Sequence, residues 1–180
     1  MPNATLCILS DSHGRPDAIA QVLRRVRPDG ILFAGDGLRD LSRVELPCPL
    51  WAVRGNCDWM SSPLIVGGSL CEPPEEELLM WEGFRILLCH GHRFGVKSGL
   101  SVAAVHAAAR GADVLIFGHT HTPLERRIPA GELLGGVPLE KDLYIFNPGS
   151  IGDGLRPAFG TLTVRGGGTP RVPLFGHGTL

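Results

Sequence analysis

Short apolar runs alternate along the chain with stretches whose apolar residues recur at helical spacing. This alternation is typical of α/β folds, in which strands and helices pack as separate layers. The apolar runs are rich in Val, Ile, Leu and Phe. They predict strands over residues 5–10, 30–34, 50–54, 64–66, 78–81, 85–89, 114–117, 124–128, 144–146 and 159–164.

Two longer stretches have the spacing expected of helices. Residues 18–26 follow Pro16, and proline suits the first turn of a helix. Residues 98–110 predict a second helix, with Ser98 as its N-cap and Gly111 as the residue that ends it.

Glycine and proline mark the segments between and after these elements. Residues 129–140 open with a proline and are rich in glycine, which predicts a surface loop or a hairpin. The tail from Gly166 is either a last edge strand or a loose end. We expect one domain over residues 1–180, because neither a repeat nor a linker interrupts the pattern.

The composition limits the partners of the chain. A net charge of −1, from 17 basic and 18 acidic residues, argues against an extended nucleic-acid partner, which requires many phosphate contacts. No apolar run approaches the ~20 residues of a membrane span. The apolar run at residues 6–9 is too short for a signal peptide, so we expect a cytoplasmic protein without a membrane partner. The mean hydropathy of +0.12 leaves room for a homodimer.

The five cysteines include no Cys-x-x-Cys pair. An odd, scattered set argues against both a disulfide framework and a structural zinc site. We expect reduced thiols, mostly buried, at positions 7, 48, 71 and 89, and treat Cys57 separately below.

Residues that can bind a metal follow five of the predicted strands. These residues are Asp11 with His13, Asp36, Asn56, His90, and His119 with His121. In open α/β sheets the carboxyl ends of the strands form the edge at which ligands bind. Residues two apart in an extended segment point the same way, so each Asp-x-His or His-x-His pair can converge on one site.

Each of these motifs alone has an ordinary structural explanation. An Asp-x-His is commonly a turn, and a Gly-Asp after a strand is commonly a turn or a helix cap. A structural account does not explain why such residues occur together at five strand ends. Carboxylate, imidazole and amide groups without a thiolate suit a catalytic site for Mn, Fe, Zn, Ni or Co. The sequence therefore predicts a metal centre.

The order of the motifs, Asp-x-His, Gly-Asp, Gly-Asn, His and Gly-His-x-His, resembles the calcineurin-like metallophosphoesterase family. It is most similar to the small phosphodiesterases of that family, which share the Gly-Asn-Cys-Asp of residues 55–58 and the Asn-Pro-Gly-Ser of residues 147–150. The resemblance spans residues 6–151. It implies a four-layer α/β/β/α sandwich of two mixed β-sheets flanked by helices, with a dinuclear site at one edge.

The resemblance also implies how the metal ligands divide. Asp11, His13 and His121 would hold the first ion, Asn56, His90 and His119 would hold the second, and Asp36 would bridge the two. Two divalent ions are expected, manganese before nickel, iron, cobalt or zinc. A water between them would lose a proton near neutral pH and attack the phosphorus of a small phosphodiester.

Three further residues complete the expected catalytic set of Asp36, Asn56, Cys57, Asp58 and His92. Many larger family members have histidine where this chain has Cys57, and a thiol is a weak donor to a leaving group. Cys57 therefore favours diesters with acidic leaving groups, whether it acts chemically or only lines the pocket. His92 either compensates as a proton donor or hydrogen-bonds within its own loop. Asp58 either orients its loop or a ligand histidine, or is a turn residue.

Two other functions remain open from the sequence. Some eukaryotic relatives of the small type serve as trafficking subunits, which would make this chain a protein-interaction scaffold with weak or no catalysis. The complete ligand set favours an enzyme instead. A phosphomonoesterase is the other alternative, and Cys57 counts against it. The motifs do not identify the physiological substrate.

Overall fold

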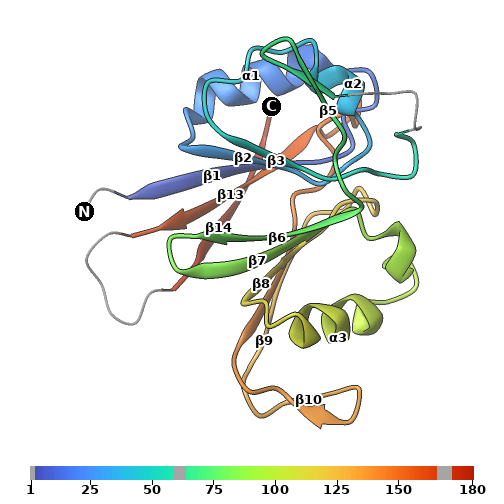
Figure 1. The fold of residues 1–180 in the computed structure, drawn as a ribbon, viewed down its shortest axis with the longest axis vertical. Coiled ribbons are helices and arrows are strands. Elements are labelled where there is room, and N and C mark those ends of the chain that lie inside the picture. The colour runs from blue at the N-terminus through green and yellow to red at the C-terminus, as the bar shows by residue number, and fades with distance from the viewer. Residues whose placement is uncertain (1–2, 59–63, 166–171) are drawn as a thin grey trace.

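The computed structural model describes residues 3–58, 64–165 and 172–180, and its elements form four layers (Figure 1). Two large mixed sheets face each other, helices α1 and α2 cover the outer face of one, and α3 covers the outer face of the other. This architecture confirms the α/β/β/α sandwich that the resemblance implied. Every predicted strand is present, with bounds within two residues of those predicted.

The first sheet has the strand order β14-β13-β1-β2-β3. Its parallel strands are β1 (Ala4–Leu9), β2 (Gly30–Phe33) and β3 (Leu50–Ala52). The antiparallel strands are β13 (Ala158–Val164) and β14 (Leu174–Thr179). Of the tail from Gly166, the described part contains an edge strand, one of the two predicted forms, whereas residues 166–171 lie outside the described residues.

The second sheet has the order β6-β7-β8-β12-β9. Strands β7 (Phe84–Cys89), β8 (Val114–Ile116) and β12 (Leu143–Asn147) are parallel, and β6 (Glu76–Trp81) and β9 (Leu124–Ile128) are antiparallel edges. Two small hairpins stand apart, β4 (Leu64–Val66) with β5 (Ser69–Cys71), and β10 (Leu133–Leu134) with β11 (Val137–Pro138). The β10–β11 hairpin lies within residues 129–140, for which a surface loop or a hairpin was predicted.

Strict alternation of side chains divides the core into layers. In β1, Leu6 and Ile8 pack between the two sheets, whereas Cys7 and Leu9 pack against the outer helices α1 (Pro16–Val26) and α2 (Leu38–Leu41). Strands buried on both faces read as continuous apolar runs, which is why the sequence showed them clearly.

The second predicted helix begins later than expected. Helix α3 spans Ser101–Ala109, its N-cap is Leu100, and no side chain caps it, so the prediction of Ser98 as N-cap is wrong. Gly99 has φ +157°, which is incompatible with a helix, and the N–H of Ser98 donates to the carbonyl of Gly95 in a separate turn. Gly111, with φ +66°, does follow the end of the helix. No helix in the described parts of the chain is long and apolar enough to cross a membrane.

Candidate metal centre

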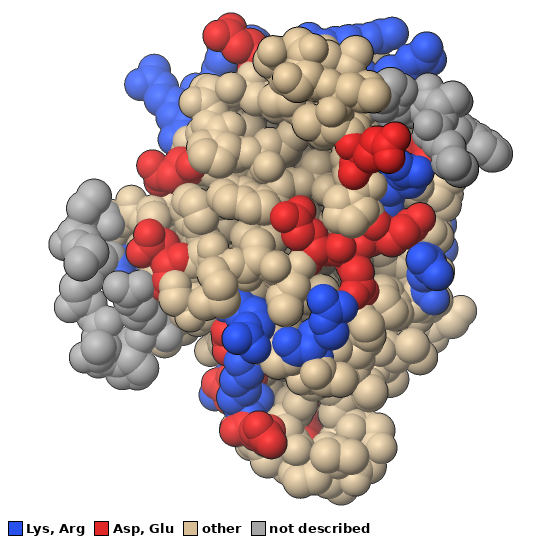
Figure 2. Space-filling model, in the orientation of Figure 1, with Lys and Arg blue, Asp and Glu red and all other residues tan. Residues whose placement is uncertain are grey.

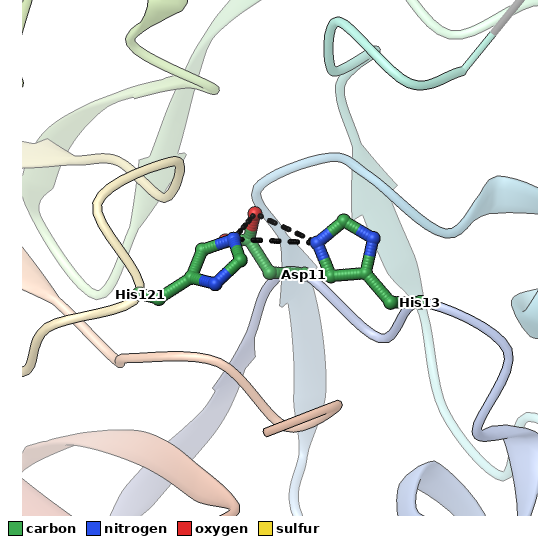
Figure 3. A group of neighbouring side chains, drawn as sticks. All are labelled: Asp11, His13 and His121. Atoms are coloured by element: carbon green, nitrogen blue, oxygen red, sulfur yellow. Dashed lines mark hydrogen bonds and ion pairs between the residues drawn. The ribbon is translucent and has the colours of Figure 1, made fainter. Parts of the chain in front are cut away.

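The loops after β1, β2, β3, β7 and β8 gather at one edge of the two facing sheets, since these strands run parallel within their sheets (Figure 1). Figure 3 shows one group of side chains there, in which Asp11 and His13 from the loop after β1 meet His121 from the loop after β8. Oδ1 of Asp11 lies 3.1 Å from Nε2 of His121 and 3.7 Å from Nε2 of His13. The two imidazole nitrogens are 3.3 Å apart.

The carboxylate of Asp11 shows what this group is suited to hold. Its Oδ2 accepts hydrogen bonds from the Ser10 hydroxyl at 2.5 Å and the His119 N–H at 3.0 Å. Its Oδ1 is buried and accepts no hydrogen bond from any described residue. Burying an unpaired carboxylate oxygen is costly. Because Oδ1 faces the ring nitrogens of His13 and His121, a divalent cation would satisfy all three atoms.

A second group lies beside the first and contains Asp36, His90 and His119. Nε2 of His90 is 3.2 Å from Oδ2 of Asp36 and 3.2 Å from Oδ1 of Asn56. Nδ1 of His90 donates to the carbonyl of Ala34 at 2.6 Å. That bond leaves Nε2 as the atom free to bind a metal, the usual arrangement for a ligand histidine.

Asp36 belongs to more than one group of possible ligands. Its carboxylate also lies within 4.8 Å of the ligand atoms of His13 and Cys57. The structure therefore places Asp36 between His13 of the first group and His90 and His119 of the second. A carboxylate that bridges two ions requires this position.

Ionisation states at the centre follow from burial and from the contacts of Asp36. Burial opposes ionisation of Asp36, but hydrogen bonds from His90 and Cys57 outweigh it and lower its pKa. Burial lowers the pKa of His119 to about 4, and the charge of His90 adds to the effect. Burial opposes protonation of His90 too, yet Asp36 and Asp11 raise its pKa overall. At neutral pH the metal-free centre thus has an ionised Asp36 and a neutral His119, the forms that bind cations.

Backbone strain is concentrated in these same loops. Seven non-glycine residues of the described chain have positive φ, and five of them are predicted ligands: Asp11 at 54°, His13 at 42°, Asp36 at 59°, His119 at 65° and His121 at 59°. Left-handed conformations cost roughly 1–2 kcal/mol per residue, less for Asp. Such strain commonly persists at functional sites because the surrounding structure enforces it.

Asp58 organises the backbone around Asp36. Its carboxylate accepts four main-chain hydrogen bonds, from Asp36 at 2.7 Å, Gly37 at 2.9 Å, Leu38 at 3.0 Å and Gly55 at 3.0 Å. Among the described residues, Asp58 forms no hydrogen bond or ion pair with a ligand histidine. Of its predicted roles, Asp58 has that of orienting the loops, and it joins the loop after β2 to the loop after β3.

Two further residues position the loop after β1. Asp40 is buried in α2, and its Oδ2 accepts hydrogen bonds from the Ser12 hydroxyl at 2.6 Å and the Gly14 N–H at 2.7 Å. The Ser150 hydroxyl donates to the carbonyl of Asp11 at 2.8 Å. Sequence analysis missed Asp40, whose only signal was its spacing after the Gly-Asp motif.

Cys57 and His92 flank the centre in different ways. The N–H of Cys57 donates to Oδ1 of Asp36 at 2.7 Å, and burial together with Asp36 raises the pKa of the thiol to about 11. The thiol is therefore protonated at neutral pH. The ring of His92 lies 5.4 Å from that of His90 and 6.1 Å from that of His119. Its Nε2 is 3.8 Å from Glu75, and its buried Nδ1 has no described partner, so the predicted hydrogen bond within its own loop is not formed.

Comparison with protein families identifies this arrangement of loops. The family model of the calcineurin-like phosphoesterase superfamily domain matches residues 5–166. The chain belongs to this superfamily. It is 33% identical over 147 residues to the probable metallophosphoesterase YsnB of Bacillus subtilis, covering 80% of this chain and 73% of that protein. It is 30% identical over 165 residues to the phosphodiesterase YfcE of Escherichia coli K12, covering 81% and 78%.

Solved structures of the superfamily share the fold of this phosphoesterase domain. A novel archaeal phosphodiesterase has a TM-score of 0.68 at 18% identity, covering 98% of this chain and 99% of that one. Vps29 of Entamoeba histolytica complexed with zinc has a TM-score of 0.60 at 21% identity, covering 96% and 98%. At these identities the likeness establishes the fold alone.

Proposed function

We propose that this chain is a phosphodiesterase that hydrolyses small phosphodiesters with two divalent metal ions. The observation that supports this most directly is the position of Asp36 between two groups of potential ligands. Membership of the metallophosphoesterase superfamily supports the use of metals, and the relationship to YfcE supports diesters as substrates. Manganese is the ion we expect first.

The ligands of the two ions would be those predicted from the sequence. One ion would be held by Asp11, His13 and His121, the other by Asn56, His90 and His119, with Asp36 shared. The ions, when bound, would supply Lewis acidity toward the phosphoryl group and lower the pKa of a nearby water. Asp58 and Asp40 hold the loops at the spacing this chemistry needs, and so act as positioning residues.

The preference for diesters over monoesters rests on Cys57. With a pKa of about 11, the thiol stays neutral beside the phosphate and does not repel it. A neutral thiol is nevertheless a weak hydrogen-bond donor, so it protonates a departing oxygen poorly. Esters whose leaving group is already acidic, such as aryl phosphodiesters, depend least on that protonation. The ring of His92 lies beside those of His90 and His119 but forms no hydrogen bond with a described ligand residue.

The decisive experiment is an activity panel on metal-stripped protein reconstituted with Mn, Ni, Co, Zn or Mg. We expect hydrolysis of bis(p-nitrophenyl) phosphate, with slower hydrolysis of p-nitrophenyl phosphate. Asp36→Ala should lose both ions and His13→Ala mainly one, measured by metal content after gel filtration. The exposed Asp17→Ala serves as the control that keeps both.

A protein-interaction scaffold is the second candidate function, and one observation favours it. Large apolar side chains are exposed on α3 and on the β10–β11 hairpin, namely Val102, Val105, Leu133 and Val137. Vps29 of Cryptosporidium parvum, a vacuolar protein sorting protein by name, shares this fold with a TM-score of 0.63 at 15% identity, so the architecture occurs beyond proteins named as phosphoesterases. Absence of hydrolysis with every metal in the panel would refute the enzyme and favour the scaffold.

A further inference from the structure

Two arginines lie beside the proposed metal centre without a carboxylate partner. Arg39 and Arg43 line a pocket of about 350 Å³ whose other walls include His13, Asp36 and Cys57. The pocket therefore opens directly onto the proposed ligands. Both arginines are exposed, and neither forms an ion pair with a residue of the described segments 3–58, 64–165 and 172–180.

The acidic residues of this pocket do not neutralise the arginines. Asp40 is directed inward to Ser12 and Gly14, and Asp58 accepts its four main-chain hydrogen bonds. Both carboxylates are buried and engaged with neutral donors, and the third acidic residue of the pocket, Asp36, faces His90 and the N–H of Cys57. Elsewhere in the described chain, basic residues such as Arg110, Arg127 and Lys141 do pair with carboxylates. The two arginines near the centre are free to bind an external anion.

Helix α2 and the turn that follows it hold these arginines at the pocket. Leu38 and Leu41 are fully buried against the first sheet, and the backbone N–H of Leu38 is held by Asp58. Arg39 lies on α2, and Arg43 lies two residues beyond its end, in a turn where its N–H donates to the carbonyl of Asp40 at 3.0 Å. Both side chains are exposed and line the same pocket, so the short helix that follows Asp36 and the turn after it carry the two cations at the rim of the centre.

A different flank of the centre, beside His92, is rich in acidic residues. Acidic side chains gather where the chain enters β6 (Figure 2), a segment that contains Glu72, Glu75, Glu76 and Glu77. A second pocket of about 350 Å³ there is lined by Glu75, Glu76 and His92. Arg93 also lines this second pocket, and Glu76 there pairs with Arg110, so the α2 side differs in having two arginines without a carboxylate partner among the described residues.

We propose that Arg39 and Arg43 form a subsite for a second anionic group, a carboxylate or a phosphate, on one substituent of the substrate phosphodiester. The proposal rests on the proposed function and adds the class of substrate. The planar guanidinium groups suit either anion. Because both side chains are exposed, their effect is moderate and is screened by salt.

The test compares two esters that differ in one group, p-nitrophenyl 3-carboxypropyl phosphate and p-nitrophenyl butyl phosphate. We expect kcat/KM for the carboxylate ester to exceed that for the butyl ester by about tenfold at low salt, with the preference shrinking as NaCl is added. In the Arg39→Gln/Arg43→Gln double variant the preference should fall to about one. Arg24→Gln, an exposed arginine near the far end of α1, should keep the wild-type preference.

A binding measurement separates failure of the subsite from failure of the proposed function. We expect titration calorimetry of the metal-loaded protein to show that 3-carboxypropylphosphonate binds with a Kd about tenfold lower than that of butylphosphonate, in line with the kcat/KM preference. If neither ester is hydrolysed by the wild type, the proposed function is wrong, and the Kd ratio alone decides on the subsite. Equal Kd and kcat/KM values for the two wild-type ligands, or a preference that survives in the double variant, would overturn the subsite.

Discussion

Replacing Asp58 by asparagine tests whether the link between the loops after β2 and β3 maintains the metal centre. Each carboxylate oxygen of Asp58 accepts two main-chain hydrogen bonds, Oδ2 from Asp36 and Gly55, Oδ1 from Gly37 and Leu38. An asparagine keeps one acceptor oxygen and turns an NH₂ group toward the other two donors. Hydrogen bonds to a charged group contribute ~1.5–3 kcal/mol each, so the loss of two should cost about 3–6 kcal/mol.

That cost is large against a typical unfolding free energy of ~5–15 kcal/mol. With a urea dependence of ~1–3 kcal/mol per M, the denaturation midpoint of Asp58→Asn should fall by about 2 M. Its metal affinity should drop ~10–100-fold, as for other residues that support ligands. Asp17→Asn, an exposed aspartate paired with Arg15, should change stability by less than about 1 kcal/mol. A change below 1 kcal/mol in Asp58→Asn, with wild-type metal affinity, would refute the reasoning.

Three other changes probe the centre. Gly118→Ala would place a Cβ 1.9 Å from Oγ of Ser10, so it should lower the free energy of unfolding by about 1–3 kcal/mol in urea denaturation and weaken metal binding. Gly154→Ala is the control, because a Cβ there meets nothing within 4 Å and should leave the stability unchanged. Equal stabilities of the two variants would contradict this. The folded pKa of His119, about 4, lies below its ordinary 6.5, so the unfolded state takes up the proton first. Metal-free protein should therefore lose stability between pH 6.5 and 4, and His119→Gln should lose less; parallel pH profiles of the urea midpoint would exclude this role. Cys57→His should raise the ratio of kcat/KM for the monoester to that for the diester by ~10-fold or more, measured with p-nitrophenyl esters. An unchanged ratio would show that Cys57 does not determine the substrate preference.

Most of the fold was predictable because its central strands are buried on both faces. All three residues of Val114–Ile116 are buried, and a continuous apolar run of this kind is typical of a strand covered on both faces. The start of α3 was not predictable, since Ser98 is a favourable cap in isolation and only the backbone of Gly99 excludes it. The short helix α2 (Leu38–Leu41) was missed because four residues carry no measurable periodicity.

The members of the centre were predictable as a set, but not their supports. The spacing of Asp11, His13 and His121 predicts that they share a site, and the structure brings their ligand atoms within 4.8 Å of one another. Asp40 and Asp58 resemble ordinary turn aspartates in sequence, because their role depends on which N–H groups the folded chain brings to them. The contact of His177 was not predictable for the same reason. Its Nε2 lies 2.8 Å from the carbonyl oxygen of Asn147 because β14 pairs with β13 in the folded chain.

The left-handed backbone conformations of five predicted ligands affect how this sequence would evolve. At roughly 1–2 kcal/mol for each of the three histidines and less for the two aspartates, these residues lower the stability of the folded state by about 3–6 kcal/mol, which is comparable with the net stability of many domains. Glycine at the position of His13 or His121 would release part of that energy. Under the proposed function, metal binding is what retains histidine at these positions, so we expect that a lineage without need of the metals would gain stability by replacing the ligands one at a time.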